Sequence, residues 1–310
     1  VLSTGAGLGA TVHGREPLGH PQWSLSASLL TNDTYTDLRG NIGLNYSWTG
    51  GPVNVNLSGS LNDVPREKQF YAANRYVPFV ERQYAGRVGL TYPLRSVDDY
   101  LAFSTAFRVE RRLFRSRPSV SHDPSDSQPR QPDHGWFNQL DLSIFYSNLE
   151  RYPQSVSIER GISGNLSLRL QPELLGSDYE STYFNYGLRL FHPNPLFDRH
   201  VFGLKLDGGI ARSSFRGGRV YAVGGTRPQD VLTDMLLQSP RGQFVLRGYP
   251  PGFLVGSQFQ VWTGSYRFPI WRIEHGFSTV PLYLSRLKGR LFVDAGGAFN
   301  GLLANADLRT

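Results

Sequence analysis

The sequence predicts an all-β fold, an antiparallel transmembrane β-barrel of about twelve strands. Three observations predict it. Apolar and polar residues alternate with a period of two in many segments, long and short connectors alternate between these segments, and aromatic residues gather at the segment ends. Bacterial outer-membrane barrels combine these features, because each strand faces lipid on one side and a polar lumen on the other.

The alternation is clearest at residues 53–62, where odd positions are apolar or Gly and even positions are Asn or Ser. Successive strand residues point to opposite faces, so this segment has one apolar and one polar face. The same pattern recurs along the whole chain. It predicts strands at about residues 3–14, 22–31, 38–48, 52–62, 83–93, 99–110, 136–147, 161–171, 181–191, 200–213, 257–269 and 287–299.

A soluble β-sandwich also alternates, but its strands are typically ~5–6 residues long. The segments here are closer to the ~9–11 residues of a tilted membrane strand. Their polar faces carry small Ser, Asn and Gly with scattered Arg, as a polar lumen would. Tyr and Trp stand where the aromatic girdles of a membrane barrel are expected, at Trp23, Trp48, Tyr92, Tyr100, Trp136, Tyr146 and Trp271.

The connectors differ in length in a regular way. Residues 49–51 and 94–98 form short turns, whereas 64–82 and 111–135 are long. Outer-membrane barrels have short periplasmic turns and long outer loops, so this rhythm fits the barrel. No second domain is predicted, and residues 1–310 are assigned to one barrel domain. A helix-like stretch at 230–238 lies inside the longest loop.

Charge and chemistry exclude several functions. The net charge of +7 comes mainly from Arg, which is spread along the chain rather than clustered with aromatic residues, so lumen and loop charge is favoured over nucleic-acid binding. There is no Cys, no Gly-x-Ser-x-Gly elbow and no metal-ligand spacing among the His residues. The sequence therefore predicts no catalytic residue, no metal site and no cofactor.

The segment after residue 220 carries several motifs in order. A double glycine, a later Arg-Gly-Tyr tripeptide, a strand ending in Tyr-Arg-Phe-Pro at 266–269 and a Phe-x-Asp-x-Gly strand follow one another; their residues are Gly224, Gly225, Arg247, Gly248, Tyr249, Phe292, Asp294 and Gly296. This combination resembles the outer membrane protein 85 superfamily, the bacterial surface antigen barrels of the BamA, TamA and two-partner-secretion transporter type. The tripeptide marks the sixth outer loop of that family.

The resemblance implies that the sixth loop, approximately 215–256, folds back into the lumen as a plug. Its Arg247 would reach Asp294 on the inner wall, which alternation places on the same face as Phe292 and Gly296. Family members often carry Glu where this chain has Ser265, so the Arg here would lack a second acidic partner. Gly248 would allow a sharp turn and Tyr249 would pack beside it.

The resemblance also implies a function. The chain would be an outer-membrane barrel that inserts or translocates other outer-membrane or secreted proteins without catalysis. Its partners would be lipopolysaccharide and phospholipid, unfolded client proteins, and periplasmic domains outside this chain, either POTRA repeats or a propeller. The alternative is a passive diffusion pore, which the polar inner face would also suit.

The register of the motifs suggests truncation at both ends. By the resemblance, the chain begins near the second strand and stops after the thirteenth of roughly sixteen. Open sheet edges in hydrocarbon leave backbone groups unpaired, at several kcal/mol each. We therefore expect the strands near 3–14 and 287–299 to be paired on one side only. Direct pairing between them would instead indicate a complete barrel.

Overall fold

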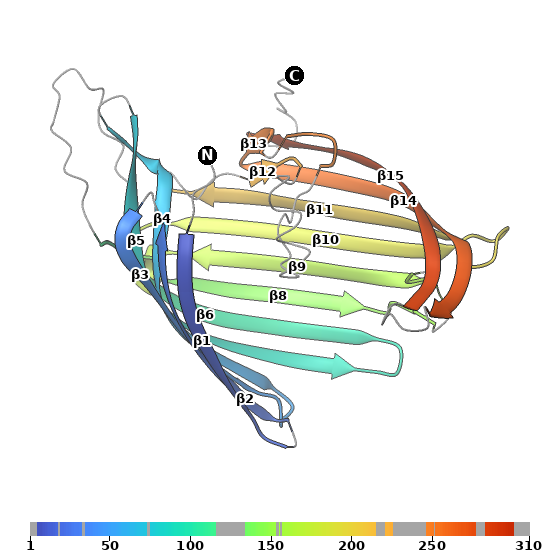
Figure 1. Ribbon diagram of the computed structural model, residues 1–310, viewed down its shortest axis with the longest axis horizontal. Coiled ribbons are helices and arrows are strands. Elements are labelled where there is room, and N and C mark those ends of the chain that lie inside the picture. The colour runs from blue at the N-terminus through green and yellow to red at the C-terminus, as the bar shows by residue number, and fades with distance from the viewer. Residues whose placement is uncertain are drawn as a thin grey trace.

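The fold is a curved antiparallel sheet, shown in Figure 1. The computed structural model describes residues 5–17, 19–32, 35–72, 75–115, 134–152, 155, 157–214, 221–225, 246–250, 252–276 and 283–300. Its strands are β1 (Gly5–Arg15), β2 (Pro21–Asn32), β3 (Tyr35–Trp48), β4 (Asn54–Ala72), β5 (Arg75–Arg95), β6 (Tyr100–Phe114), β7 (Gly135–Trp136), β8 (Gln139–Ser147), β9 (Gly161–Gln171), β10 (Ser181–Pro193), β11 (Val201–Ser213), β12 (Tyr221–Val223), β13 (Leu254–Gly256), β14 (Gln258–Gly276) and β15 (Tyr283–Phe299).

The strand order follows the chain almost without exception. The path runs β1-β2-β3-β4-β5-β6-β8-β9-β10-β11-β14-β15, while the short β7 pairs with β6, and β12 and β13 form a separate two-stranded sheet. Within the described residues β1 and β15 lie at opposite ends of this path and do not pair with each other. The expected one-sided pairing of the two outermost strands is therefore confirmed for this part of the chain.

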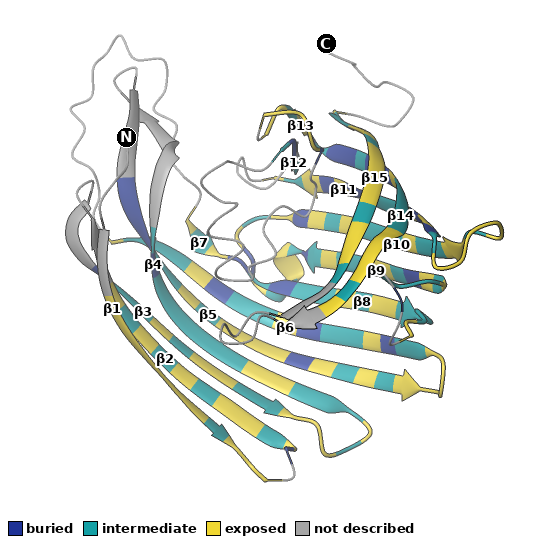
Figure 2. Cartoon of the chain, turned by 45° about the vertical axis from the view of Figure 1, so that its right-hand side comes forward, coloured by how far each residue is buried: buried dark blue, intermediate teal, exposed yellow. Residues whose placement is uncertain are grey.

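The two faces of the sheet differ in chemistry, as the alternation predicts. Figure 2 shows exposed residues alternating with more buried ones along the strands. The outer face exposes large apolar side chains that neighbour one another across strands: Leu25, Leu44, Leu57, Val88, Phe103, Phe107, Leu142, Ile144, Leu166, Phe184, Leu204 and Trp262. An apolar surface this continuous marks contact with a membrane or a partner. The inner face instead buries polar groups such as Glu110, Gln139 and Gln171.

The twelve predicted strands correspond to the twelve strands of the path, but the predicted long loop at 64–82 is wrong. There β4 and β5 continue as a hairpin, with Val64 opposite Glu81 and Tyr71 opposite Tyr76. Aromatic and β-branched residues favour strands, and they extend the pairing past the polar residues around Pro65. A register shift between Arg66 and Phe70 interrupts the ladder.

Other strands are longer than expected as well. β6 reaches Phe114, β14 reaches Gly276 and β15 begins at Tyr283. The helix-like stretch at 230–238 and most of the 111–135 connector lie outside the described residues. The described chain contains one helical turn, the 3₁₀ segment Glu173–Leu175, and no described helix is long and apolar enough to span a membrane.

The base of the β4–β5 hairpin is fixed by one buried carboxylate. Asp63 accepts hydrogen bonds from the Gly40 backbone N–H on β3 at 3.1 Å, from Arg82 Nε on β5 at 2.7 Å and from Arg115 Nη1 beyond β6 at 2.8 Å. Its side chain is fully buried. Because a buried charge must be paired and hydrogen-bonded, this carboxylate ties three neighbouring segments together where β3 separates from β4.

Candidate lumen-loop anchor on the inner wall

The inner face of β14 and β15 forms the floor of the candidate site. Thr263 lies opposite Asp294, Val261 opposite Gly296 and Phe259 opposite Ala298. Residues two apart on a strand share a face, so these side chains form one continuous inner surface. The sequence alternation in β15 places Asp294 and Phe292 on that same surface.

Parts of the loop between β11 and β14 pack against this surface. Val223 and Leu246 form a buried apolar cluster with Phe259 and Val261 of β14. The Tyr221 hydroxyl donates a hydrogen bond to Asn185 Oδ1 of β10 at 2.8 Å. Full burial of an aliphatic side chain contributes about 1.5–3 kcal/mol, so Val223 and Leu246 together stabilise this contact substantially. The described parts of the loop therefore lie on the inner wall.

A bidentate ion pair with Asp294 holds Arg247 on the inner wall. Its Nε lies 2.7 Å from Asp294 Oδ2 and its Nη2 lies 2.9 Å from Asp294 Oδ1. The guanidinium also stacks on the Phe292 ring, 3.8 Å from the ring centroid. The Asp294 side chain is 4% exposed, whereas that of Arg247 is 37% exposed. Bidentate geometry and ring stacking fix both the position and the plane of the guanidinium.

Asp294 has a further partner that sequence reasoning missed. The Thr263 hydroxyl donates a hydrogen bond to Asp294 Oδ1 at 2.8 Å. Ser265 stands at the position where the resemblance implies a Glu. Its hydroxyl donates a hydrogen bond to the Gly203 carbonyl of β11 at 3.3 Å. Only the pairing of β14 with β15 identifies Thr263, because that pairing places Thr263 directly opposite Asp294.

The double glycine is explained by a close approach of two backbone segments. Leu246 N–H donates to the Gly224 carbonyl at 2.9 Å, and Gly225 N–H donates to the Tyr249 carbonyl at 2.9 Å. A Cβ at Gly224 would lie 2.2 Å from the Pro250 carbonyl oxygen, and one at Gly225 would lie 2.2 Å from that of Tyr249. Any side chain at either position would push the segment that carries Arg247 off the double glycine.

The other motif residues have distinct roles. Gly248 adopts φ +92°, a left-handed conformation that favours glycine, so the chain turns directly after Arg247. The Tyr249 ring lies 5.2 Å from the Phe253 ring of the same loop, and about half of its surface is exposed. At Gly296 a Cβ would lie 2.7 Å from the Gln260 carbonyl oxygen, so β14 and β15 approach closely there.

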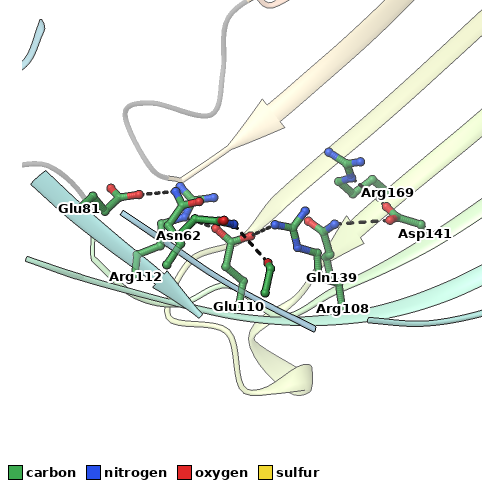
Figure 3. Close-up of polar contacts among 10 residues, drawn as sticks. Asn62, Glu81, Arg108, Glu110, Arg112, Gln139, Asp141 and Arg169 are labelled. Carbon is green, nitrogen blue, oxygen red and sulfur yellow. Dashed lines mark hydrogen bonds and ion pairs between the residues drawn. The ribbon is translucent and has the colours of Figure 1, made fainter. Parts of the chain in front are cut away.

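A second polar region covers the inner wall of β5, β6, β8 and β9, and sequence reasoning did not single it out. Glu110 pairs with Arg108 at 2.7 Å and with Arg112 at 2.6 Å, and Asp141 pairs with Arg169 at 2.8 Å (Figure 3). A cavity of about 810 Å³ lies beside it; its lining includes Arg87, Asp141, Arg169, Asn185, Arg189, Lys205, Asp207 and Tyr221. The acids of this region are thus paired within the sheet, whereas Arg87 has no ion pair among the described residues.

The fold was compared with known proteins. No family model and no curated protein sequence matches the chain. Among solved structures it is similar to CdiB from Acinetobacter baumannii (12% identity, TM-score 0.53, 97% of this chain and 48% of that chain), to BamA from Haemophilus ducreyi lacking POTRA domains 1–3 (15%, 0.52, 96% and 58%) and to CdiB from Escherichia coli (12%, 0.53, 94% and 53%). The chain thus spans about half the length of these proteins. At this identity the likeness concerns the fold: the chain has the β-sheet architecture of the BamA and CdiB barrels.

Proposed function

We propose that the chain is the wall of a bacterial outer-membrane barrel that inserts or secretes other proteins. The observation that carries the proposal is the Arg247–Asp294 ion pair, which fastens an inward-folded loop to the inner wall of a BamA-like and CdiB-like sheet. The apolar outer face would contact phospholipid and lipopolysaccharide, and client proteins would pass along or through the barrel. Such work is mechanical and requires no catalytic residue.

The anchor would hold in place the loop that the sequence analysis predicts as a plug at approximately 215–256, of which the structure describes residues 221–225, 246–250 and 252–256. Removing one partner of a fully buried ion pair costs ~3–5 kcal/mol of stability. Arg247 is partly exposed, so its removal should weaken loop docking by less than this. About 2 kcal/mol is a reasonable value for a bidentate pair with one buried partner. A latch of this strength holds the loop in place most of the time, yet a client that binds in the lumen could release it.

The test uses the full-length protein in cells depleted of the native copy. Arg247→Ala should lower the surface level of client proteins, whereas Arg87→Ala should not. Arg87 is a matched control, because it is an arginine of the inner wall that lines the cavity without an ion pair among the described residues. Normal client levels after depletion of the protein itself would contradict an insertion or secretion role.

Conductance separates this proposal from a passive pore. In planar bilayers a latched loop should keep the wild-type protein mostly closed, and Arg247→Ala should open it more often. A wide and steady conductance in the wild-type protein would favour the pore instead.

A further inference from the structure

A row of cations runs along the inner face of β15 below the anchor. Arg286, Lys288 and Arg290 occupy alternate positions that continue the face of Phe292 and Asp294. Arg267 of β14 lies directly opposite Arg290. We refer to Arg267, Arg286, Lys288 and Arg290 as the basic ladder. It continues down the same inner wall on which the loop is anchored.

Three of the four ladder residues have no ion pair within the part of the chain that the structure describes. Arg267, Lys288 and Arg290 form no ion pair with any acidic group of the described chain, and Lys288 and Arg290 are exposed. Two described carboxylates lie on these strands: Asp294 already accepts hydrogen bonds from Arg247 and Thr263, and Glu274 already pairs with Arg272, which lies opposite Arg286. The like charges also repel one another, because Arg290 and Arg267 lie directly opposite each other on neighbouring strands. Holding them together without a counter-charge destabilises the protein, so the arrangement favours a bound anion.

Arg267 has a buried donor atom that no described residue satisfies. Its guanidinium stacks on the Phe191 ring of β10, 4.8 Å from the ring centroid, which fixes its plane. Its Nε is buried and has no hydrogen-bond partner among the described residues. A buried donor without a partner costs about 1–3 kcal/mol, so this is a fixed and unsatisfied donor.

The β8–β9 turn closes the lower end of the ladder. Arg286 Nη1 donates to the Ser155 carbonyl at 2.9 Å, although the two residues are 131 positions apart in the chain. Tyr152 and Ser155 stabilise the turn through reciprocal hydrogen bonds of 3.0 Å.

The spacing of the ladder identifies the chemistry of its ligand. Alternate residues of an antiparallel strand are about 6.8 Å apart, and so are alternate residues of any extended peptide. An extended segment with acidic residues at every second position would therefore place one carboxylate at each rung. The ladder also lies on the inner wall, away from the apolar face that meets lipid, which favours a polypeptide over a lipid headgroup.

We propose that the basic ladder binds an acidic, extended segment of a polypeptide inside the barrel. The identification of that polypeptide as a client rests on the proposed function; the binding site itself does not. Arg267 and Arg290 would form charge-assisted hydrogen bonds with carboxylates, and Lys288 would supply a third positive charge.

The experiment measures binding of a short fluorescent peptide to the full-length protein in detergent micelles. The probe alternates Asp with Thr; comparison peptides carry the same Asp residues in one block, or Asn in place of Asp. Arg267→Gln with Arg290→Gln should weaken binding of the alternating peptide about tenfold, a loss of about 1.4 kcal/mol. The control, Arg87→Gln with Arg189→Gln, removes the same charge from two inner-wall arginines that line the cavity.

Each possible outcome either supports or contradicts the proposed binding site. A tenfold loss in the ladder variant, less than about threefold in the control, and preference for the alternating peptide would support the site. Equal losses in both variants would show a general lumen potential, and no preference between acidic peptides would remove the spacing argument; either result overturns it. Tighter competition by a bisphosphorylated glucosamine headgroup would assign the site to lipid and overturn the peptide. Client levels in cells are measured in a separate experiment. If the proposed function fails there, the peptide-binding result can still be interpreted.

Discussion

Two regions of the inner wall handle charge in opposite ways. On β6, β8 and β9 the acids pair with arginines: Glu110 lies between Arg108 and Arg112, and Asp141 pairs with Arg169. On β14 and β15, Arg267, Lys288 and Arg290 have no ion pair among the described residues, and Asp294 and Glu274 are already bound to Arg247 and Arg272. The same alternation of residues produces both walls. The first pairs its acids within the sheet, whereas the second holds three cations without an ion pair among the described residues.

The paired wall should be the more costly one to break. Glu110→Gln removes the charge that separates Arg108 from Arg112 inside a nearly buried site. We expect a loss of about 3 kcal/mol in the free energy of unfolding, measured by urea titration of the protein folded in lipid vesicles. Glu173→Gln, an exposed acid in the 3₁₀ turn, should change it by less than about 0.5 kcal/mol. Similar values for the two variants would show that the paired wall is not structural.

The double glycine should be as sensitive to substitution as the anchor itself. Gly225→Ala places a Cβ against the Tyr249 carbonyl and should destabilise the docked loop by about 2 kcal/mol. Limited proteolysis should then cut the loop faster, while the unfolding midpoint of the sheet stays close to that of the wild type. Gly86→Ala is the control, because a Cβ there meets nothing within 4 Å. Unchanged cleavage in Gly225→Ala would contradict the close approach.

Substitutions at Arg247 should show whether its charge or its hydrogen-bonding geometry holds the loop. Arg247→Lys keeps the positive charge but loses the bidentate contact and the planar stacking on Phe292. Its loop should be cut at a rate between those of the wild type and Arg247→Ala, for which we expect a loss of about 2 kcal/mol in docking. If Lys behaves as the wild type, the charge alone holds the loop.

The smallest effect is expected at Thr263. Thr263→Val keeps the shape but removes one hydrogen bond to Asp294, so loop docking should weaken by about 1 kcal/mol. Thr263→Ser keeps the hydroxyl and should restore most of this loss. A Val variant with the cleavage rate of the wild type would mean that Arg247 alone orients Asp294.

The sequence predicted the strands well for a physical reason. A strand that faces lipid on one side and a polar lumen on the other must alternate, so residues such as those at 53–62 reveal both the strand and its faces. The hairpin at 64–82 was missed because polar residues around Pro65 interrupt the alternation, while cross-strand pairing continues beyond them.

The site was only partly accessible to sequence reasoning. Arg247 and Asp294 could be named because each lies in a short motif, and the structure places them 2.7 Å apart. Thr263, Arg286, Lys288 and Arg290 lie in no recognised motif, and the Tyr-Arg-Phe-Pro motif that contains Arg267 does not reveal its neighbours. Arg267 and Arg290 are 23 positions apart and become neighbours only through the β14–β15 register, so a list of residues along the chain makes their charges look dispersed.

The β4–β5 hairpin has a mechanical consequence. Its strands are 19 and 21 residues long, whereas crossing a membrane takes only ~9–11. The excess of roughly ten residues at ~3.3 Å each makes a lever arm of about 30 Å. Its fulcrum is Asp63, whose carboxylate joins Gly40, Arg82 and Arg115. A force applied to the far end of the lever is therefore transmitted, as torque, to three segments of the wall at once.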